Sequence, residues 1–186
     1  LTQTRGVKCW GLNLNGQLGD GSLNNRLVPV EVSGLASGIE QISMGTGHAC
    51  ALTSGGGVKC WGSSSYGAVG DGTSSTRTTP VDVIGLTTGA AGLAAGWDHT
   101  CARMSAGTIA CWGRNSDGEL AEGTRVNRNT PRHASGMGAG ITTMALGSSH
   151  TCMGTMEGGV RCKGSSMAVP FGNYGAIAAT NVPGLA

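Results

Sequence analysis

Cysteine and histidine are the residues of this sequence whose types and spacing could do chemistry. Three stretches each begin with a histidine and carry two cysteines ten residues apart. They are HACALTSGGGVKCWG from His48, HTCARMSAGTIACWG from His99 and HTCMGTMEGGVRCKG from His150. Thiols and imidazoles spaced in this way could bind a metal, carry out redox chemistry or form disulfides that hold neighbouring strands together.

Hairpin geometry favours the disulfides. If the first stretch is a hairpin that turns at Gly55, residue 50 lies opposite residue 60. Directly opposed residues have Cβ atoms about 4.5 to 5.5 Å apart, and a slight pinch of the strands brings them to disulfide distance. A disulfide across so short a loop is worth about 2 to 3 kcal/mol. The predicted disulfides are Cys50–Cys60, Cys101–Cys111 and Cys152–Cys162.

Two other interpretations of the cysteines stay open. A zinc ion could use His48, Cys50 and Cys60 on one hairpin face, but a fourth protein ligand is missing, so we expect no metal site. Free buried thiols are the second alternative, because cysteine also packs as a small hydrophobe. Disulfides imply an oxidising compartment, so we expect an extracellular, periplasmic or cell-surface protein. The seventh cysteine, Cys9, has no partner ten residues earlier and is predicted to be unpaired, or to pair between molecules.

The elements that must position these residues repeat with a period of 51 residues. Cys-Trp-Gly begins at Cys9, Cys60 and Cys111, and Cys-Lys-Gly begins at Cys162. Within each unit, short apolar runs alternate with period two between clusters of Gly, Ser, Asn and Asp, which predicts about four short strands. A unit of about 50 residues with four strands is the size of one propeller blade.

The predicted fold is therefore all-β, a partial β-propeller of four-stranded blades. Dividing 186 residues by the 51-residue period gives about 3.6 blades. We expect a single repeat domain, 1–186, with an incomplete unit at 1–37, complete units at 38–88 and 89–139, and a degenerate unit at 140–186. The last unit is degenerate because Lys163 stands where its sister units have tryptophan.

The unit resembles a known repeat. CWGxNxxGQLGDG, a polar tract with NRxxP, PVxVxGL and then GxxHxCAL are together similar to the regulator of chromosome condensation repeat, over residues 7 to 162. That family is known for seven-bladed propellers, so the resemblance implies blades that form about half a ring. We expect either a longer array or a homodimer of two copies that completes the circle.

Other residues that keep the 51-residue step are expected to be structural. The histidines are predicted to make hydrogen bonds inside each blade, and the tryptophans of Cys-Trp-Gly to pack between blades. Acidic and basic residues six apart are predicted to brace the polar loop. The residues are His48, His99, His150, Trp10, Trp61 and Trp112, with the pairs Asp20–Arg26, Asp71–Arg77 and Glu122–Arg128.

Trp97 breaks the repeat, because its sister positions hold Thr46 and Ser148. An irregular aromatic residue on a recurrent loop is a candidate partner contact. With three more residues that differ from their sister units it forms a predicted interaction patch, with local packing as the alternative. The predicted patch is Trp97, Asp98, Arg103 and Met104.

Composition narrows the function. Charged residues are 12% of the chain and the net charge is +2, so we expect no nucleic-acid partner. No apolar run reaches about 18 residues, so we expect no membrane insertion. No motif for a catalytic triad, phosphate loop, dinucleotide or zinc protease is present, so we expect no enzyme and no cofactor.

The favoured function is a non-catalytic, secreted or cell-surface scaffold that binds a protein or a glycan. The resemblance implies an alternative, guanine-nucleotide exchange on a small GTPase, although the first three units lack an insertion that could act as a wedge. GWDHT at 96–100 also resembles family members that sense ultraviolet light. Only Trp97 occupies that loop class here, so a cluster of coupled indoles is not expected.

Overall fold

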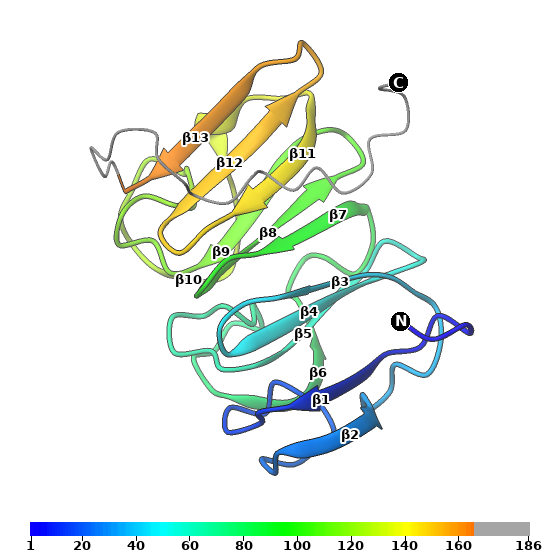
Figure 1. Ribbon diagram of the computed structural model, residues 1–186. Coiled ribbons are helices and arrows are strands. Elements are labelled where there is room, and N and C mark those ends of the chain that lie inside the picture. The colour runs from blue at the N-terminus through cyan, green and yellow to red at the C-terminus, as the bar shows by residue number, and fades with distance from the viewer. Residues whose placement is uncertain (166–186) are drawn as a thin grey trace.

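The computed structural model of the chain describes residues 1–165, and within them the regular structure is almost entirely β (Figure 1). The exception is a short 3-10 turn, η1, at Ser135–Met137. The first sheet has two strands, β1 (Lys8–Gly11) and β2 (Arg26–Glu31). The all-β prediction is confirmed.

Two four-stranded antiparallel sheets follow, each with its strands side by side in chain order. The strands of the first are β3 (Ile39–Met44), β4 (His48–Thr53), β5 (Val58–Gly62) and β6 (Arg77–Asp82). The strands of the second are β7 (Ala90–Ala95), β8 (His99–Met104), β9 (Ile109–Gly113) and β10 (Arg128–His133). The described part of the last sheet consists of β11 (Ile141–Leu146), β12 (His150–Thr155) and β13 (Val160–Gly164).

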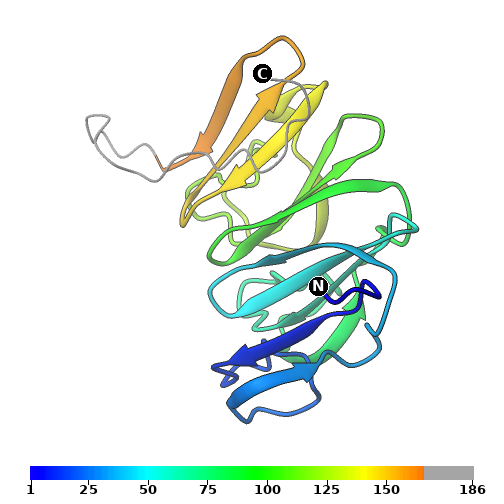
Figure 2. The ribbon, with the colours of Figure 1, turned by 45° about the vertical axis from the view of Figure 1, so that its right-hand side comes forward.

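The sheets fan out from a common edge formed by β3, β7 and β11 (Figure 2). Side chains of β3 bond to the backbone of β7, which joins the two sheets at this edge. The Gln41 amide donates to the Leu93 carbonyl at 2.7 Å and accepts from the Leu93 N–H at 2.9 Å, and Ser43 Oγ accepts from the Ala95 N–H at 2.9 Å. This is the arrangement of propeller blades around an axis, whereas the number of blades in a full ring stays a prediction.

The core lies between sheets rather than inside them, because a single sheet cannot bury both of its faces. It consists of three apolar clusters, one at each junction between successive sheets. Two of the clusters are built around a fully buried indole, Trp61 in the first and Trp112 in the second. The third cluster contains no tryptophan and relies on smaller side chains such as Leu120, Met137 and Met153.

Candidate functional site

All three predicted disulfides are present. Cysteines ten residues apart lie directly opposite each other on neighbouring strands, with Cα atoms 4.1 Å apart. The first two disulfides are fully buried, whereas Cys162 of the third is exposed on β13. The disulfides are Cys50–Cys60, Cys101–Cys111 and Cys152–Cys162. Within residues 1–165 Cys9 is a buried free thiol, and burial raises its pKa.

Two of the three repeat histidines, His48 and His99, join neighbouring sheets, which corrects the expectation of bonds inside each blade. His48 Nε2 lies 2.8 Å from the Thr100 hydroxyl of the next unit, and His99 Nε2 lies 2.8 Å from that of Thr151. Because the Thr100 hydroxyl gives its one hydrogen to the Ala68 carbonyl, it accepts from His48. The expectation failed because the threonine partner is 52 residues away, so nothing in one unit alone shows it.

Burial holds these histidines neutral. Desolvation lowers the pKa of His48 to about 4 and that of His99 to about 3, because the interior penalises the charged imidazolium. Among the buried polar side-chain atoms that the structure describes, His99 Nδ1 has no hydrogen-bond partner. His48 and His99 are therefore neutral links between sheets and not general acids or bases near neutral pH.

Two of the three tryptophans predicted to pack between sheets do so, Trp61 and Trp112, whereas Trp10 is 62% exposed. The Trp61 indole donates to the Gln17 carbonyl at 2.9 Å, and the Trp112 indole donates to the Ala68 carbonyl at 2.8 Å. Each indole lies against a glycine with positive φ in the preceding unit. A Cβ on Gly19 would lie 2.8 Å from Trp61 Nε1, and one on Gly70 would lie 2.7 Å from Trp112 Nε1. Glycine is required at these positions by both the space and the backbone conformation.

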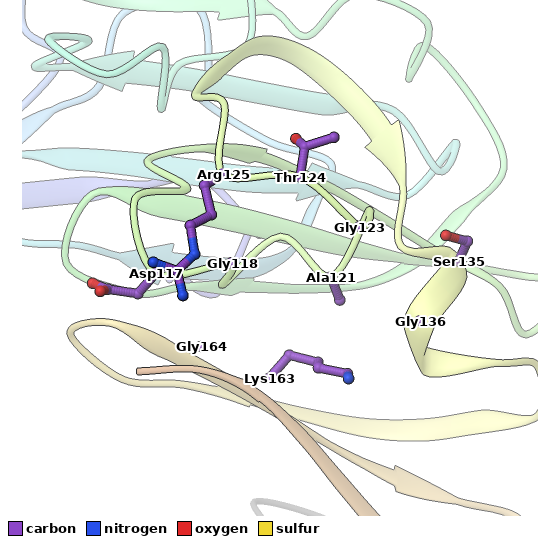
Figure 3. Close-up of a pocket in the computed structure, with 10 residues that line it drawn as sticks. All are labelled: Asp117, Gly118, Ala121, Gly123, Thr124, Arg125, Ser135, Gly136, Lys163 and Gly164. Carbon is purple, nitrogen blue, oxygen red and sulfur yellow. The ribbon is translucent and has the colours of Figure 1, made fainter. Parts of the chain in front are cut away.

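The third junction breaks this pattern on both sides. Lys163 takes the place of the indole, and Ala121, with φ of 54°, takes the place of the glycine. A hollow of about 420 Å³ lies there (Figure 3). We call it the Lys163 pocket, and its walls are the 117–125 loop, the 135–136 turn and the end of β13, with Asp117, Gly118, Ala121, Gly123, Thr124, Arg125, Ser135, Gly136, Lys163 and Gly164 as lining residues.

The predicted pairs of the polar loop form as ion pairs. The guanidinium groups of Arg26 and Arg77 lie 2.6 Å from the carboxylates of Asp20 and Asp71. The third pair, Arg128 with Glu122, has a separation of 2.9 Å. Desolvation opposes ionisation of Asp20, but hydrogen bonds from Ser22 and Arg26 outweigh it and lower the pKa of this carboxyl to about 2.

Trp97 lies in the loop between β7 and β8, at the end of the inner strands. Its indole is 62% exposed. The loop is tied to its neighbours, because the Thr46 N–H donates to the Trp97 carbonyl and the Trp97 N–H donates to the Gly147 carbonyl. A groove of about 340 Å³ runs over these loops. We call it the Trp97 groove, lined by Met44, Gly45, Thr46, Ala95, Gly96, Trp97, Leu146 and Gly147.

The structure divides the predicted patch between the two ends of β8. Trp97 and Asp98 precede the strand, whereas Arg103 and Met104 end it, so the two pairs are separated by about 15 to 20 Å of extended chain. Arg103 donates to the Ala91 carbonyl at 2.8 Å, and Met104 packs against the apolar core. The four residues therefore cannot contact one small partner group together.

Sequence reasoning missed two residues of the Trp97 groove, Met44 and Leu146. They occupy the same place in their units as Ala95, one residue before the recurrent glycine. The 51-residue step could have placed both beside Trp97, since inner strands of neighbouring blades lie side by side. Met44 is 53% exposed, so the groove offers an apolar surface to a partner.

Comparisons with known proteins agree with this architecture. The Regulator of chromosome condensation (RCC1) repeat matches residues 7–52, 56–103 and 106–153. The chain belongs to the RCC1-repeat family. Solved structures with the same fold include human WBSCR16, with a TM-score of 0.77 and 24% identity over 88% of this chain and 44% of that one. Prp20p of Saccharomyces cerevisiae has a TM-score of 0.75 and 25% identity, over 90% of this chain and 43% of that one.

Among RCC1-repeat relatives, this chain is similar to the ultraviolet-B receptor UVR8 of Arabidopsis thaliana, with 36% identity over 66% of this chain and 28% of UVR8. It is 30% identical to the human E3 ubiquitin-protein ligase HERC2 over 81% of this chain but 3% of HERC2. The chain thus spans small parts of both relatives.

Among residues 1–165 no group of three or more His, Cys, Asp or Glu side chains is placed to hold a metal ion. No helix in that part of the chain is long and apolar enough to cross a membrane.

Proposed function

We propose that this RCC1-repeat propeller is a non-catalytic interaction scaffold that binds a protein or glycan partner through the Trp97 groove. The observation that carries the proposal is the exposed indole of Trp97 on loops that are held in place by backbone bonds to both neighbouring units. A large aromatic side chain on a rigid base loses little conformational entropy on binding, so it is suited to anchor a partner.

The three disulfides support an extracellular, periplasmic or cell-surface location for this scaffold, because such bonds persist in oxidising compartments. They link β4 to β5, β8 to β9 and β12 to β13, and so hold the strands on which the groove loops are mounted.

Photo-crosslinking tests the site. A photoreactive phenylalanine analogue at position 97 should capture a specific partner from an extracellular fluid, and excess unlabelled chain should abolish the capture. Trp97→Ala chain should compete at least about tenfold less well. Tyr66→Ala is the matched control, because Tyr66 is also an exposed aromatic side chain but does not line the Trp97 groove. Equal competition by the two variants contradicts the proposed site.

Guanine-nucleotide exchange on a small GTPase is the second candidate. The observation in its favour is the structural similarity to Prp20p, a protein described by its binding to Gsp1p and histones. This chain covers 43% of the Prp20p chain. A nucleotide-release assay against a panel of small GTPases separates the two candidates, since a scaffold leaves the release rate unchanged.

Ring completion is a further part of the proposal. Trp10 keeps the position at which Trp61 and Trp112 insert into a preceding unit, yet its indole is exposed. This supports packing of another unit against it, either from a longer array or from a second copy. Light scattering at micromolar concentration tests the second copy, and a monomer contradicts the homodimer.

A further inference from the structure

Of the three junctions that the structure describes, the third, which holds the Lys163 pocket, has basic side chains and no packed indole. In the two sister junctions the corresponding places hold Trp61 and Trp112, and the loop position of Arg125 holds Leu23 and Ser74. The third junction therefore combines an open volume of about 420 Å³ with two basic side chains. That volume lies within the range of about 300 to 1,000 Å³ that is typical of sites for small molecules.

The two cations of the pocket have no acidic partner among the described residues. Asp117, the carboxylate in the pocket wall, is held by Arg114 at 2.9 Å, and Arg114 also bonds Glu119 at 3.1 Å. No ion pair of residues 1–165 involves Arg125 or Lys163. Figure 3 shows Arg125 and Lys163 on opposite walls, one on the 117–125 loop and the other on β13.

The net positive charge of the chain is also concentrated near this pocket. Residues 114–165 carry six Arg and Lys against four Asp and Glu, whereas residues 1–113 carry six of each kind. The entire net charge of +2 therefore belongs to the part of the chain that builds the third junction. An anion that approaches this junction meets a favourable field before it reaches the two cations.

We propose that the Lys163 pocket binds a small organic anion with a carboxylate or phosphate group. Lys163 and Arg125 donate charge-assisted hydrogen bonds to the anionic group from the two walls, and the glycine backbone between them lets the ligand approach closely. The apolar part of the ligand covers Ala121, whose sister positions Gly19 and Gly70 lie against an indole, and extends over the neighbouring Gly136.

Titration of the intact chain with succinate and with inorganic phosphate, at constant ionic strength, tests this proposal. The amide resonances of Ala121 and Gly136 should shift in a saturable way with at least one of the two probes. Lys163→Gln and Arg125→Gln should each weaken that binding about tenfold, since each removes a charge-assisted bond. Lys163→Arg should retain it.

Arg103→Gln is the matched control, because Arg103 also lacks an acidic partner in the described structure but lies in another part of the molecule. It should leave the titration unchanged. Shifts that never saturate, or an equal loss in Arg103→Gln and Lys163→Gln, overturn the proposal. Because Trp97→Ala should not alter the titration, failure here is distinguishable from failure of the interaction scaffold.

A short peptide of Asp and Glu as a further probe identifies the source of the anion. If it saturates the same amides at about tenfold lower concentration than succinate, the anionic group comes from an acidic segment of a partner. If it binds more weakly, the ligand is a free small molecule.

Discussion

The junction around Trp112 and the junction around Lys163 occupy the same place in successive units, yet they differ in every feature that matters for packing. The first buries an indole against Gly70 with a hydrogen bond to the Ala68 carbonyl. The second has an alkyl ammonium side chain above Ala121 and an open pocket. The indole and the glycine change together, and Ala121 keeps a positive φ of 54°, so this position holds a methyl group where no indole lies against it.

The difference also separates stability from function. Trp61 and Trp112 have exposed fractions of 0%, so burial of each whole side chain stabilises the contact between two sheets. The Lys163 junction gives up that packing and gains a basic, accessible cavity. The two kinds of junction should therefore differ in their response to mutation: loss of a buried indole should destabilise the fold, whereas loss of Lys163 should not.

Truncation of the buried indole should have the largest effect. Trp112→Ala should lower the free energy of unfolding by about 3 to 5 kcal/mol, because it removes a large buried side chain and leaves a cavity. Lys163→Ala should change it by less than about 0.5 kcal/mol, as is usual for an exposed side chain. Denaturant unfolding of both variants measures the contrast, and equal losses would contradict it.

The second-largest effect should come from acid, which destabilises the hydrogen bonds that link sheets through His48 and His99. Folding lowers the pKa of His48 to about 4, so the unfolded chain takes up a proton first as the pH falls. Stability is full above the unfolded pKa of about 6.5 and decreases between pH 6.5 and 4, by about 3 kcal/mol for His48. Unfolding midpoints across this range in wild type and in His48→Gln check the effect, because the variant should show a shallower dependence.

The fold and the site differ in how much of them the sequence reveals. The disulfide register and the inter-sheet tryptophans follow from one unit and its 51-residue period, since they depend on local hairpins and on a fixed step. The threonine partners of His48 and His99 do not, because they belong to the next unit. The signal was present as His-Thr at 99–100 and 150–151, against His-Ala at 48–49.

The patch around Trp97 could be predicted only in part. Trp97 stood out because it differs from Thr46 and Ser148, but difference from the sister units does not say which residues meet in space. Arg103 and Met104 differ as well, yet they end the strand that Trp97 precedes. The Lys163 pocket could not be predicted from the lysine alone, because its volume depends on how closely the two sheets approach each other where no indole lies between them.

Removal of any one disulfide should lower the free energy of unfolding by a similar amount, but the three bonds should differ in how readily a reductant reaches them. Removal of the Cys101–Cys111 bond by a double change to serine should cost about 2 to 3 kcal/mol. In the native protein, dilute reductant followed by alkylation should label Cys152 and Cys162 first, because Cys162 is exposed whereas both cysteines of the other two bonds are buried. Intact mass spectrometry counts the labelled thiols, and simultaneous labelling of all six would contradict this order.

The loop ion pairs should have the smallest effect. Arg77→Ala should cost no more than about 1 kcal/mol, because the guanidinium is partly exposed. It should nevertheless reduce hydrogen-exchange protection over residues 71–79, where Asp71 also bonds Thr73. Unchanged exchange there would show that the pair does not brace the loop.

A double-mutant cycle at the third junction tests the central contrast most directly. Lys163→Trp and Ala121→Gly together recreate the residues of the two sister junctions. We predict that the pair stabilises the protein with a coupling free energy above about 1 kcal/mol, because the indole fits only when the Ala121 methyl is removed. Additive effects of the two changes in denaturant unfolding would contradict the claim that the indole and the glycine form one packing unit.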